Sequence, residues 1–335
     1  MTRRPVGGDA HVPPRNTRGR GGGHPVGAAP PRATRRRTRR RRGRRGGRKF
    51  FLAMFFILAF VLLYTFGLDQ LFSRSGGAII LENNEILVSF IDVGQGDSIL
   101  IRTNNNAVLI DGGVRAQGNT VLRYIRNSGV RRLCYVVVTH PHYDHIGGLI
   151  TVLGRMDVGR VIMPDVTHTT QAFRDFLAVI DNNDIPVTFP EPGDRIRAGL
   201  LDFTILGPPN PHPGPPNNLN NASIIMRLEH GSTSFLFTGD AEQELERWLV
   251  DNVQDLRTNV LNVAHHGSRT STTEAFLNAV DPTAAVISLA ANNIYGHPHL
   301  EILDLLHARD IPVYRTDQLG TIRMISDGQQ IYFHR

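Results

Sequence analysis

Apolar residues recur in short blocks from residue 78 onward, and the spacing of these blocks predicts the secondary structure. Short runs of β-favouring residues between turn residues predict strands. Strands are expected in ILVSFIDV, DSILIRT, NAVLIDGG, LCYVVVTH, RVIMPDV, IPVTFP, LDFTILGP, ASIIMRLEH and STSFLFTGD. Between the third and fourth of these strands, GNTVLRYIRNSGV has helical spacing and ends near a glycine, which predicts a helix. After the fourth strand, HIGGLITVLGRM predicts a second helix.

The last part of the chain alternates helices with strands. Helices are expected in AEQELERWLVDN, TTEAFLNAV and EILDLLHARD, and strands in TNVLNVAHHGS and AAVISLA between them. The final segment, TIRMISDGQQIYFHR, predicts a hairpin that turns at Asp327 and Gly328. The proline-rich segment 207–221 is expected to be an exposed loop. The chain thus has mainly strands in its first part and alternating helices and strands in its last part. This order predicts two packed sheets with helices outside them.

Residues 50–68 differ from the rest because they form a run of 19 residues without a charge. A helix of that length can cross the hydrocarbon core of a membrane. Basic residues flank only its N-terminal side, which predicts a cytoplasmic N-terminus and an extracellular C-terminal domain. A cleaved signal peptide is the alternative, but the run is long for one and no cleavage pattern follows closely. We therefore expect a single-pass protein of the cell membrane.

The formal net charge of +7 is divided unevenly along the chain. Residues 1–49 contain 17 Arg and Lys residues and one Asp, which leaves 20 basic and 29 acidic residues in the rest. This segment has too few apolar residues to fold and predicts a disordered cytoplasmic tail. The tail could bind anionic lipid or nucleic acid, or act only as a topology signal. Residues 69–77 are expected to link the membrane span to a mildly acidic domain, residues 78–335.

Four side chains that can bind metal stand within six residues at the end of the strand LCYVVVTH. They are His140, His142, Asp144 and His145. Imidazole nitrogens suit zinc, iron or manganese, and carboxylates can complete or bridge such a site. Without a cation, the crowded groups would face desolvation and, when protonated, mutual repulsion. A polar surface loop is the alternative. The two glycines of HIGG are expected to let the backbone turn sharply beneath the site.

The motif HxHxDH after an apolar strand resembles that of the metallo-β-lactamase superfamily. Further blocks resemble the metallo-β-lactamase-like domain of ComEC-type competence proteins, namely VSFIDVGQGDSILI, VLIDGG, FLFTGDAE, NVAHHGSRTS and NNIYGHP. The resemblance extends over nearly all of residues 85–335. It implies an α/β fold, the four-layer αββα sandwich. It also implies a metal-dependent hydrolase with one or two divalent ions, zinc or manganese, that activate water.

The resemblance implies roles for individual residues. His140 and His142 match ligands of a first metal site. Asp144 and His145 match ligands of a second. Asp240 matches a carboxylate that bridges the two sites, although it could instead cap the helix that follows.

Further positions of the resemblance concern one aspartate and three histidines. Asp111 matches a residue that orients the site, with a plain turn aspartate as the alternative. We expect the last metal ligand to be His265, with His297 as second choice and His266 as third. Those that do not bind metal could support the ligands or give a proton to the leaving group. The residues expected to take part in catalysis are Asp144, His265, His266 and Asp111.

One histidine of many superfamily members has no counterpart in this chain. Where they carry a further ligand of the first site, this sequence has Asn220 and Asn221. An amide is a poor zinc ligand but suits a harder cation such as manganese. The first site is therefore expected to be weak, to hold another metal or to be completed by substrate phosphate. Candidates for substrate binding, with turn or cap roles as the alternative, are Asn221, Ser223 and Ser268.

These features predict a membrane-anchored, metal-dependent hydrolase, above all a ComEC-like phosphodiesterase or DNase that acts on DNA outside the membrane. The acidic charge of the domain disfavours DNA binding unless a basic patch offsets it. The candidates for that patch are Arg131, Arg132, Arg269 and Arg315. One alternative is a hydrolase of a small phosphodiester, a phosphocholine ester or a lactone. The other is a non-catalytic, metal-stabilised partner of a DNA-uptake machine.

The cleft around the metal distinguishes these functions. An arginine-lined groove favours a nuclease, a closed apolar pocket favours a small ester, and an occluded cleft favours the non-catalytic protein. One copy of a protein with a single membrane span cannot form a pore, so DNA transport by this protein is not expected. The sequence does not indicate the oligomeric state. Histidines outside the motifs are expected on the surface, and they are His168, His212, His230 and His334.

Overall fold

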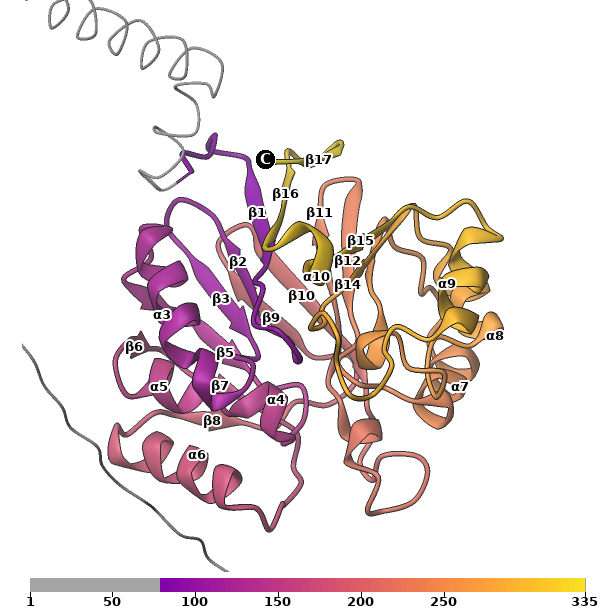
Figure 1. The fold of residues 1–335 in the computed structure, drawn as a ribbon. Coiled ribbons are helices and arrows are strands. Elements are labelled where there is room, and N and C mark those ends of the chain that lie inside the picture. The colour runs from indigo at the N-terminus through magenta and orange to yellow at the C-terminus, as the bar shows by residue number, and fades with distance from the viewer. Residues whose placement is uncertain (1–78, 335) are drawn as a thin grey trace, which may run out of the picture. The chain divides into compact units, whose positions relative to one another are not determined.

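Two β-sheets stack face to face in the computed structural model, which describes residues 79–334 (Figure 1). In spatial order, the first sheet contains β17 (Ile331–Phe333), β16 (Ile322–Ser326), β1 (Ile86–Phe90), β2 (Ile99–Arg102), β3 (Ala107–Ile110), β5 (Tyr135–Val137), β7 (Val161–Ile162) and β8 (Val187–Thr188). The second contains β15 (Val313–Arg315), β14 (Ala284–Ile287), β13 (Val260–Asn262), β12 (Thr233–Phe237), β11 (Ile225–His230), β10 (Leu201–Gly207) and β9 (Arg195–Ala198). Outside these sheets, β4 (Arg132–Leu133) pairs with β6 (Asp157–Val158).

Helices cover the outer face of each sheet. Those on the first sheet are α3 (Gly118–Asn127), α5 (Leu149–Leu153) and α6 (Gln171–Asn182). Those on the second sheet are α7 (Gln243–Asn252), α8 (Glu274–Val280) and α9 (Leu300–His307). Shorter helical turns occupy the loops and are η1 (Arg115–Gln117), α4 (Tyr143–Ile146), η2 (Leu219–Ala222), η3 (Ala264–Gly267) and α10 (Thr316–Leu319). The mixed α/β fold, with helices outside two packed sheets, agrees with the sequence prediction.

The core between the sheets accounts for the apolar strands. In β1, Ile86, Val88 and Phe90 point into this core, where the ring of Phe90 lies 6.5 Å from that of Phe237 on the second sheet. Leu87 points to the opposite face and is buried there as well. Because both faces of the sheet are covered, its strands appear in the sequence as continuous apolar runs rather than as alternating patterns.

The sequence prediction lacks helix α6, although the residues carry a signal for it. Thr170 caps the helix by accepting a hydrogen bond from the backbone of Phe173 at 3.3 Å. Phe173, Phe176 and Ile180 recur at helical spacing and are buried. The prediction also lacks β9, β15 and α10, which are too short for a periodic pattern to reveal them.

The glycines of HIGG do not form the sharp turn expected from the sequence. Gly147 and Gly148 have helical backbone angles where α4 passes into α5. Gly148 instead permits a close approach of two backbones, since a Cβ atom there would lie 1.9 Å from the carbonyl oxygen of Gly112. These glycines therefore let the helical segment after the histidine motif pack directly against the end of β3.

The structure corrects the predicted location in the cell membrane. Within residues 79–334, no helix has the length and apolar character needed to cross a bilayer. The expected anchor, residues 50–68, lies outside the described residues, as do the tail and the linker. The membrane location, with its extracellular catalytic domain, is therefore not retained.

A buried carboxylate connects α7 to the loop before α8. Glu246 is fully buried, and its oxygens accept hydrogen bonds from the backbone N–H groups of Thr272 and Thr273. Thr272 has a left-handed backbone (φ 57°), which is uncommon for a β-branched residue. Burial raises the pKa of Glu246 to about 7, against the two hydrogen bonds, which lower it.

We expect Glu246 to make folding less favourable as the pH rises. Its folded-state pKa of about 7 exceeds the ordinary 4.5, so the folded protein binds this proton more tightly than the unfolded chain does. The stabilisation is fully present below the ordinary pKa and is lost as the pH rises through the folded-state pKa, by about 3 kcal/mol. Urea unfolding at about pH 4 and about pH 8 measures the loss. Glu246→Gln should remove this part of the pH dependence, whereas Asp251→Asn on the exposed side of α7 should not. An unchanged pH dependence in Glu246→Gln would contradict the expectation.

Candidate metal centre

Strand β5 ends at Val137, and the loop after it carries the histidine motif. His140 is buried and His142 is half-buried, and His140 Nε2 lies 3.0 Å from His142 Nδ1. Asp240, which follows β12 in the second sheet, places its Oδ2 3.6 Å from His140 Nε2. The three side chains thus converge from both sheets on a position that could hold one cation.

A second group of side chains that can bind metal lies on the other side of Asp240. Its members are Asp144, His145 and His266. Asp240 Oδ1 lies 3.3 Å from His145 Nε2 and 3.5 Å from His266 Nε2. His266 Nε2 is in turn 3.6 Å from Asp144 Oδ2. Each carboxylate oxygen of Asp240 faces one of the two groups, a placement that suits a bridging ligand.

Three buried atoms of Asp240 and the second group have no hydrogen-bond partner among residues 79–334. They are His145 Nε2, His266 Nε2 and Asp240 Oδ1. Buried polar atoms are nearly always paired, because an unpaired one loses its hydration without compensation. A divalent cation would supply the missing interaction, and imidazole nitrogens with carboxylate oxygens are suitable donors for it. The residues present therefore fit a metal centre.

Hydrogen bonds behind the imidazoles determine which nitrogen faces the centre. His145 Nδ1 donates to Asp111 Oδ2 at 2.8 Å, and Asp111 also accepts from the backbone and the hydroxyl of Thr139. His266 Nδ1 donates to the carbonyl oxygen of Ser288 at 2.9 Å. Both rings therefore present Nε2 to the centre. Asp111 lies behind His145, where it orients the ring instead of facing the centre.

Mutual charge at the centre shifts the protonation of these groups. Burial lowers the pKa of His266, but Asp240 and Asp144 outweigh it and raise the pKa to about 9. Asp240 and Asp111 likewise raise the pKa of His145 well above its usual value, against burial. Burial opposes the ionisation of Asp240, yet the neighbouring imidazoles hold its pKa well below the usual range. A cation that binds here must displace protons from His145 and His266.

Comparison with known protein families agrees with this geometry. Residues 91–291, more than half of the chain, match the family model described as the Metallo-beta-lactamase superfamily. The chain belongs to this superfamily. The resemblance read from HxHxDH and the other blocks is thereby confirmed, and with it the fold of a metal-dependent hydrolase. That fold implies divalent ions, and the histidine and aspartate groups around Asp240 could hold them.

Two curated relatives are similar to most of this chain, and one of them is named as a competence protein. ComE operon protein 3 of Bacillus subtilis (strain 168) is 32% identical over 254 residues, which cover 70% of this chain and 32% of that protein. Competence protein ComA of Neisseria gonorrhoeae is 31% identical over 246 residues, which cover 72% of this chain and 32% of that protein. The chain thus spans about a third of the length of these relatives.

A solved structure shows a similar fold at low sequence identity. The crystal structure of CmlA, a diiron β-hydroxylase from Streptomyces venezuelae, superimposes with a TM-score of 0.50 and 14% identity. The match covers 73% of this chain and 54% of CmlA. At that identity the likeness concerns the fold alone.

The second group contains His266 and not His265, which was the first choice for the last ligand. His265, His266 and Gly267 are consecutive residues with left-handed backbones (φ 52°, 55° and 81°). Such a backbone costs on the order of 1–3 kcal/mol for each non-glycine residue and is found most often at functional sites. The strained turn gives the adjacent imidazoles different neighbours, so that only His266 joins Asp144 and His145.

His265 lies beside the first group instead. Its Nε2 is 3.7 Å from Asp240 Oδ2, and its Nδ1 is 3.1 Å from Thr270 Oγ1 and 3.3 Å from Glu242 Oε1. Glu242 also accepts hydrogen bonds from Thr270 and from the side chain of Asn220. This carboxylate holds His265 in place and was not among the predicted site residues. The signal in the sequence is its position two residues after Asp240.

His297 belongs to neither group of three. Its ring centre is 5.6 Å from that of His265 and 6.4 Å from that of His266. Burial and the charge of His266 lower its pKa to about 4, so it is a neutral side chain on the wall of the cleft. His168, expected on the surface, lines the same cleft, and its ring centre lies 5.7 Å from that of His142.

The three residues predicted to bind substrate are buried behind the centre. Asn221 and Ser223 are fully buried, and Ser223 Oγ accepts a hydrogen bond from the backbone N–H of Asp240 at 3.0 Å. Ser268 is buried as well. None of the three lines the cleft, whereas Asn220 does. Their contacts support the ligands and the loops that carry them.

The metal centre forms the floor of an open cleft of about 360 Å³. Tyr143, the first residue of α4, and Tyr295, in the loop after β14, line it with 49% and 58% of their surface exposed. Across residues 79–334, no arginine or lysine contributes to this lining. The cleft is therefore neither the arginine-lined groove nor the closed apolar pocket considered from the sequence.

The predicted basic patch does not form. Most of its arginines are paired with acidic neighbours, and the pairs are Arg132–Asp157 (3.2 Å), Arg269–Glu301 (3.6 Å) and Arg315–Asp317 (2.7 Å). Arg131 and Arg132 line a hollow away from the metal cleft, beside the turn between β2 and β3. The sequence did not reveal this separation because Arg269 and Arg315 lie on parts of the chain distant from these two arginines.

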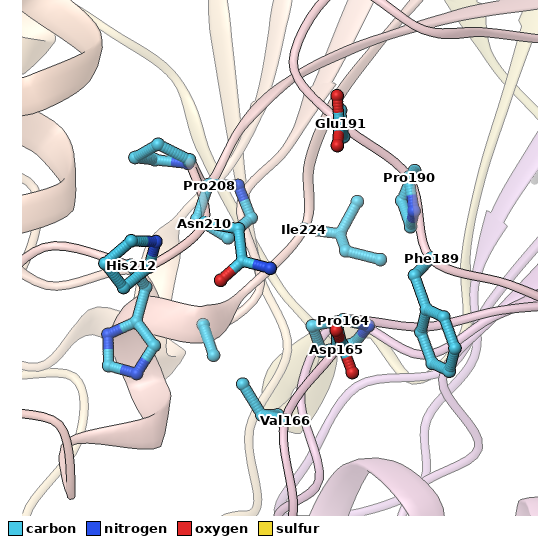
Figure 2. A pocket seen from close by; sticks show the side chains of 13 residues that line it. Pro164, Asp165, Val166, Phe189, Pro190, Glu191, Pro208, Asn210, His212 and Ile224 are labelled. Atoms are coloured by element: carbon cyan, nitrogen blue, oxygen red, sulfur yellow. The ribbon is translucent and has the colours of Figure 1, made fainter.

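A second hollow of about 300 Å³ is formed partly by the same chain segments as the metal cleft, 164–170 and 220–224. Figure 2 shows Phe189 and Pro190 on one side of it and Pro208 and His212 on the other. Prolines and apolar side chains make up most of its lining, and its two charged residues, Asp165 and Glu191, are acidic. This hollow is unsuited to an anionic ligand such as phosphate because its charged side chains are acidic.

Proposed function

We propose that this chain is a metal-dependent phosphodiesterase that cleaves nucleic acid, specifically DNA with unpaired bases. The observation that supports it is the pair of ligand groups sharing Asp240 at the floor of an open cleft with exposed tyrosines. One or two divalent cations, zinc or manganese, would supply activated water and neutralise charge on the phosphoryl oxygens. The residues proposed to hold them are His140, His142, Asp144, His145, Asp240 and His266.

His265 is proposed to act on the leaving group. Its Nδ1 faces Glu242 and Thr270, so its Nε2 is directed toward Asp240 and the cleft. A positioned imidazole at that place can give a proton to the departing oxygen. Glu242 fixes the ring orientation. Burial raises the pKa of Glu242, but hydrogen bonds from His265, Asn218, Asn220 and Thr270 outweigh it and hold the pKa at about 2, so that Glu242 stays ionised.

The tyrosines suit nucleobases because the loop of Tyr295 is rigidly built. Asn293 Oδ1 accepts hydrogen bonds from the backbones of Tyr295 (3.2 Å) and His297 (2.9 Å). The ring of Tyr295 stacks on His297 with centres 5.6 Å apart and an angle of 28°. An exposed aromatic ring held in this way can stack on an unpaired base, which contributes about 1–3 kcal/mol. Tyr143 offers a second ring between His142 and Asp144.

The name of one relative supports the same substrate. Competence is the state in which bacteria take up DNA, and Competence protein ComA of Neisseria gonorrhoeae is named for it. A cleft without arginine or lysine also favours stacking and the cations over ion pairs as the source of affinity. The same feature equally favours a small phosphodiester, which remains the second candidate. The open cleft disfavours the non-catalytic alternative.

Hydrolysis of four substrates by the full chain, with zinc and with manganese, tests this function. They are a single-stranded oligonucleotide, its duplex, an abasic oligonucleotide with the same phosphates, and bis(4-nitrophenyl) phosphate. We expect the single strand to be cleaved with a kcat/KM about 5- to 150-fold above that of the abasic strand, which is the effect of stacking one base. Cleavage of the small ester with all oligonucleotides untouched would establish the second candidate instead.

Variants at the tyrosines separate stacking from other effects. Tyr295→Ala should lower kcat/KM on the single strand to about the abasic level, whereas Tyr295→Phe should retain it, because the ring and not the hydroxyl stacks. Tyr332→Ala, an exposed tyrosine on β17 outside the cleft, is the matched control. Equal loss in the Phe and Ala variants would contradict base stacking.

A further inference from the structure

A third carboxylate lies at the metal centre without an assigned role. Asp97, in the connection between β1 and β2, is only 2% exposed. One of its oxygens lies within 4.8 Å of ligating atoms of both His145 and Asp240. Its Oδ1 is buried and has no hydrogen-bond partner in the described part of the chain.

The backbone holds Asp97 firmly against the centre. Its carbonyl oxygen accepts a hydrogen bond from Gly113 at 2.8 Å, next to the Asp111 that orients His145. Gly96 has a left-handed backbone (φ 119°), and a Cβ atom there would lie 2.2 Å from the carbonyl oxygen of Asp144. The turn before Asp97 therefore packs directly on the backbone of Asp144.

A buried carboxylate without a donor must find compensation. An ionised group that loses its hydration needs a hydrogen bond, an ion pair or a metal. Among the charged neighbours, Asp111 and Asp240 disfavour a further negative charge at this position, whereas His266 and His145 favour it when they are protonated. Asp97 Oδ1 makes no hydrogen bond to any of them. Asp97 thus has the surroundings of a metal ligand and not those of a structural ion pair.

We propose that Asp97 is a ligand of the cation in the second group. The proposal rests on the metal centre of the proposed function but not on its substrate. The second group then offers five side chains from four separate parts of the chain, and they are Asp97, Asp144, His145, Asp240 and His266. Three of the five are carboxylates, which are hard oxygen donors.

This ligand set predicts the metal and the order of binding. Carboxylate-rich sites with more than four donors suit manganese better than the four-coordinate zinc. The first group has only His140, His142 and Asp240 and lacks a third histidine. A first manganese ion should therefore occupy the second group, and the first group should bind a second ion more weakly.

Manganese binding to the full chain tests the proposal without any substrate. Free Mn²⁺ is measured by electron paramagnetic resonance, and the heat of binding by calorimetry. We expect one tight Mn²⁺ ion in the wild type and an affinity lowered at least about 30-fold in Asp97→Asn, since even groups behind the ligands account for 10- to 100-fold. Asp92→Asn, an exposed aspartate in the same connection, is the matched control and should bind like the wild type. Wild-type Mn²⁺ affinity in Asp97→Asn would overturn the proposal.

The stability of the metal-free protein gives a second readout. If a cation is what compensates the Asp97 carboxylate, metal-free Asp97→Asn should be at least as stable as the metal-free wild type. It should also lose most of the rise in Tm on adding Mn²⁺. A metal-free variant that is markedly less stable or unfolded would mean that Asp97 serves the fold itself, and this too would overturn the proposal. Normal Mn²⁺ binding without hydrolysis would count against the proposed function only.

Discussion

Asp240→Ala is expected to remove both the bound metal and the hydrolytic activity. One oxygen of Asp240 faces His140 and the other faces His145 and His266, so its loss affects both ligand groups at once. Groups that only support a ligand account for about 10- to 100-fold in metal affinity or activity. A carboxylate shared by both groups should therefore account for about 1000-fold or more in kcat/KM. Elemental analysis of the purified variant and hydrolysis of the single-stranded oligonucleotide measure the two effects.

Asp251→Ala provides the control for the Asp240 variant. Asp251 is an exposed residue of α7, close to Asp240 in sequence but outside the cleft. It should leave metal content and activity unchanged. Substantial activity in Asp240→Ala, within about tenfold of the wild type, would show that the two groups do not act through a shared carboxylate.

The adjacent histidines should respond in opposite ways to the same substitution. His266→Ala is expected to lower metal affinity by about a hundredfold or more, because His266 Nε2 faces Asp144 and Asp240. His265→Ala should keep most of the metal and lower kcat by about 10²- to 10⁴-fold, the usual contribution of a general acid. Metal content and kcat, measured on the same preparations, distinguish the two roles.

The reverse outcome would restore the first choice made from the sequence. If His265→Ala loses the metal and His266→Ala retains it, His265 is the ligand and the left-handed turn has a different conformation with metal bound. His307→Ala, at the exposed end of α9, is a histidine control that should alter neither quantity.

Local patterns in the sequence were sufficient for the layers and for the first members of the two groups of side chains around Asp240. His140, His142, Asp144 and His145 lie in one short loop, so their convergence follows from the sequence alone. The sequence also indicates Asp240, because this residue comes shortly after an apolar strand, β12 of the second sheet. The sequence does not show which of His265, His266 and His297 lies with Asp144 and His145, since three left-handed residues place His266 there and no periodic pattern encodes such a turn.

Other parts of the site depend on packing between distant segments. Asp97 approaches His145 only because the β1–β2 connection packs on the backbone of Asp144. Asn221 and Ser223 accept hydrogen bonds from the backbones of Glu242 and Asp240, and neither side chain lines the cleft. The sequence could not reveal that these side chains are buried behind the cleft.

The pairing of β1 with β16 has a consequence for synthesis on the ribosome. Ile86 lies opposite Ser326 and Phe90 lies opposite Ile322, so the first and nearly the last strands of the domain are neighbours in one sheet. Until the C-terminal hairpin has left the exit tunnel, β1 presents an apolar edge without its partner, and such edges invite pairing with other chains. The nascent domain cannot finish its first sheet before residues 322–326 have been made, and a premature stop codon shortly before residue 322 would yield an aggregation-prone product.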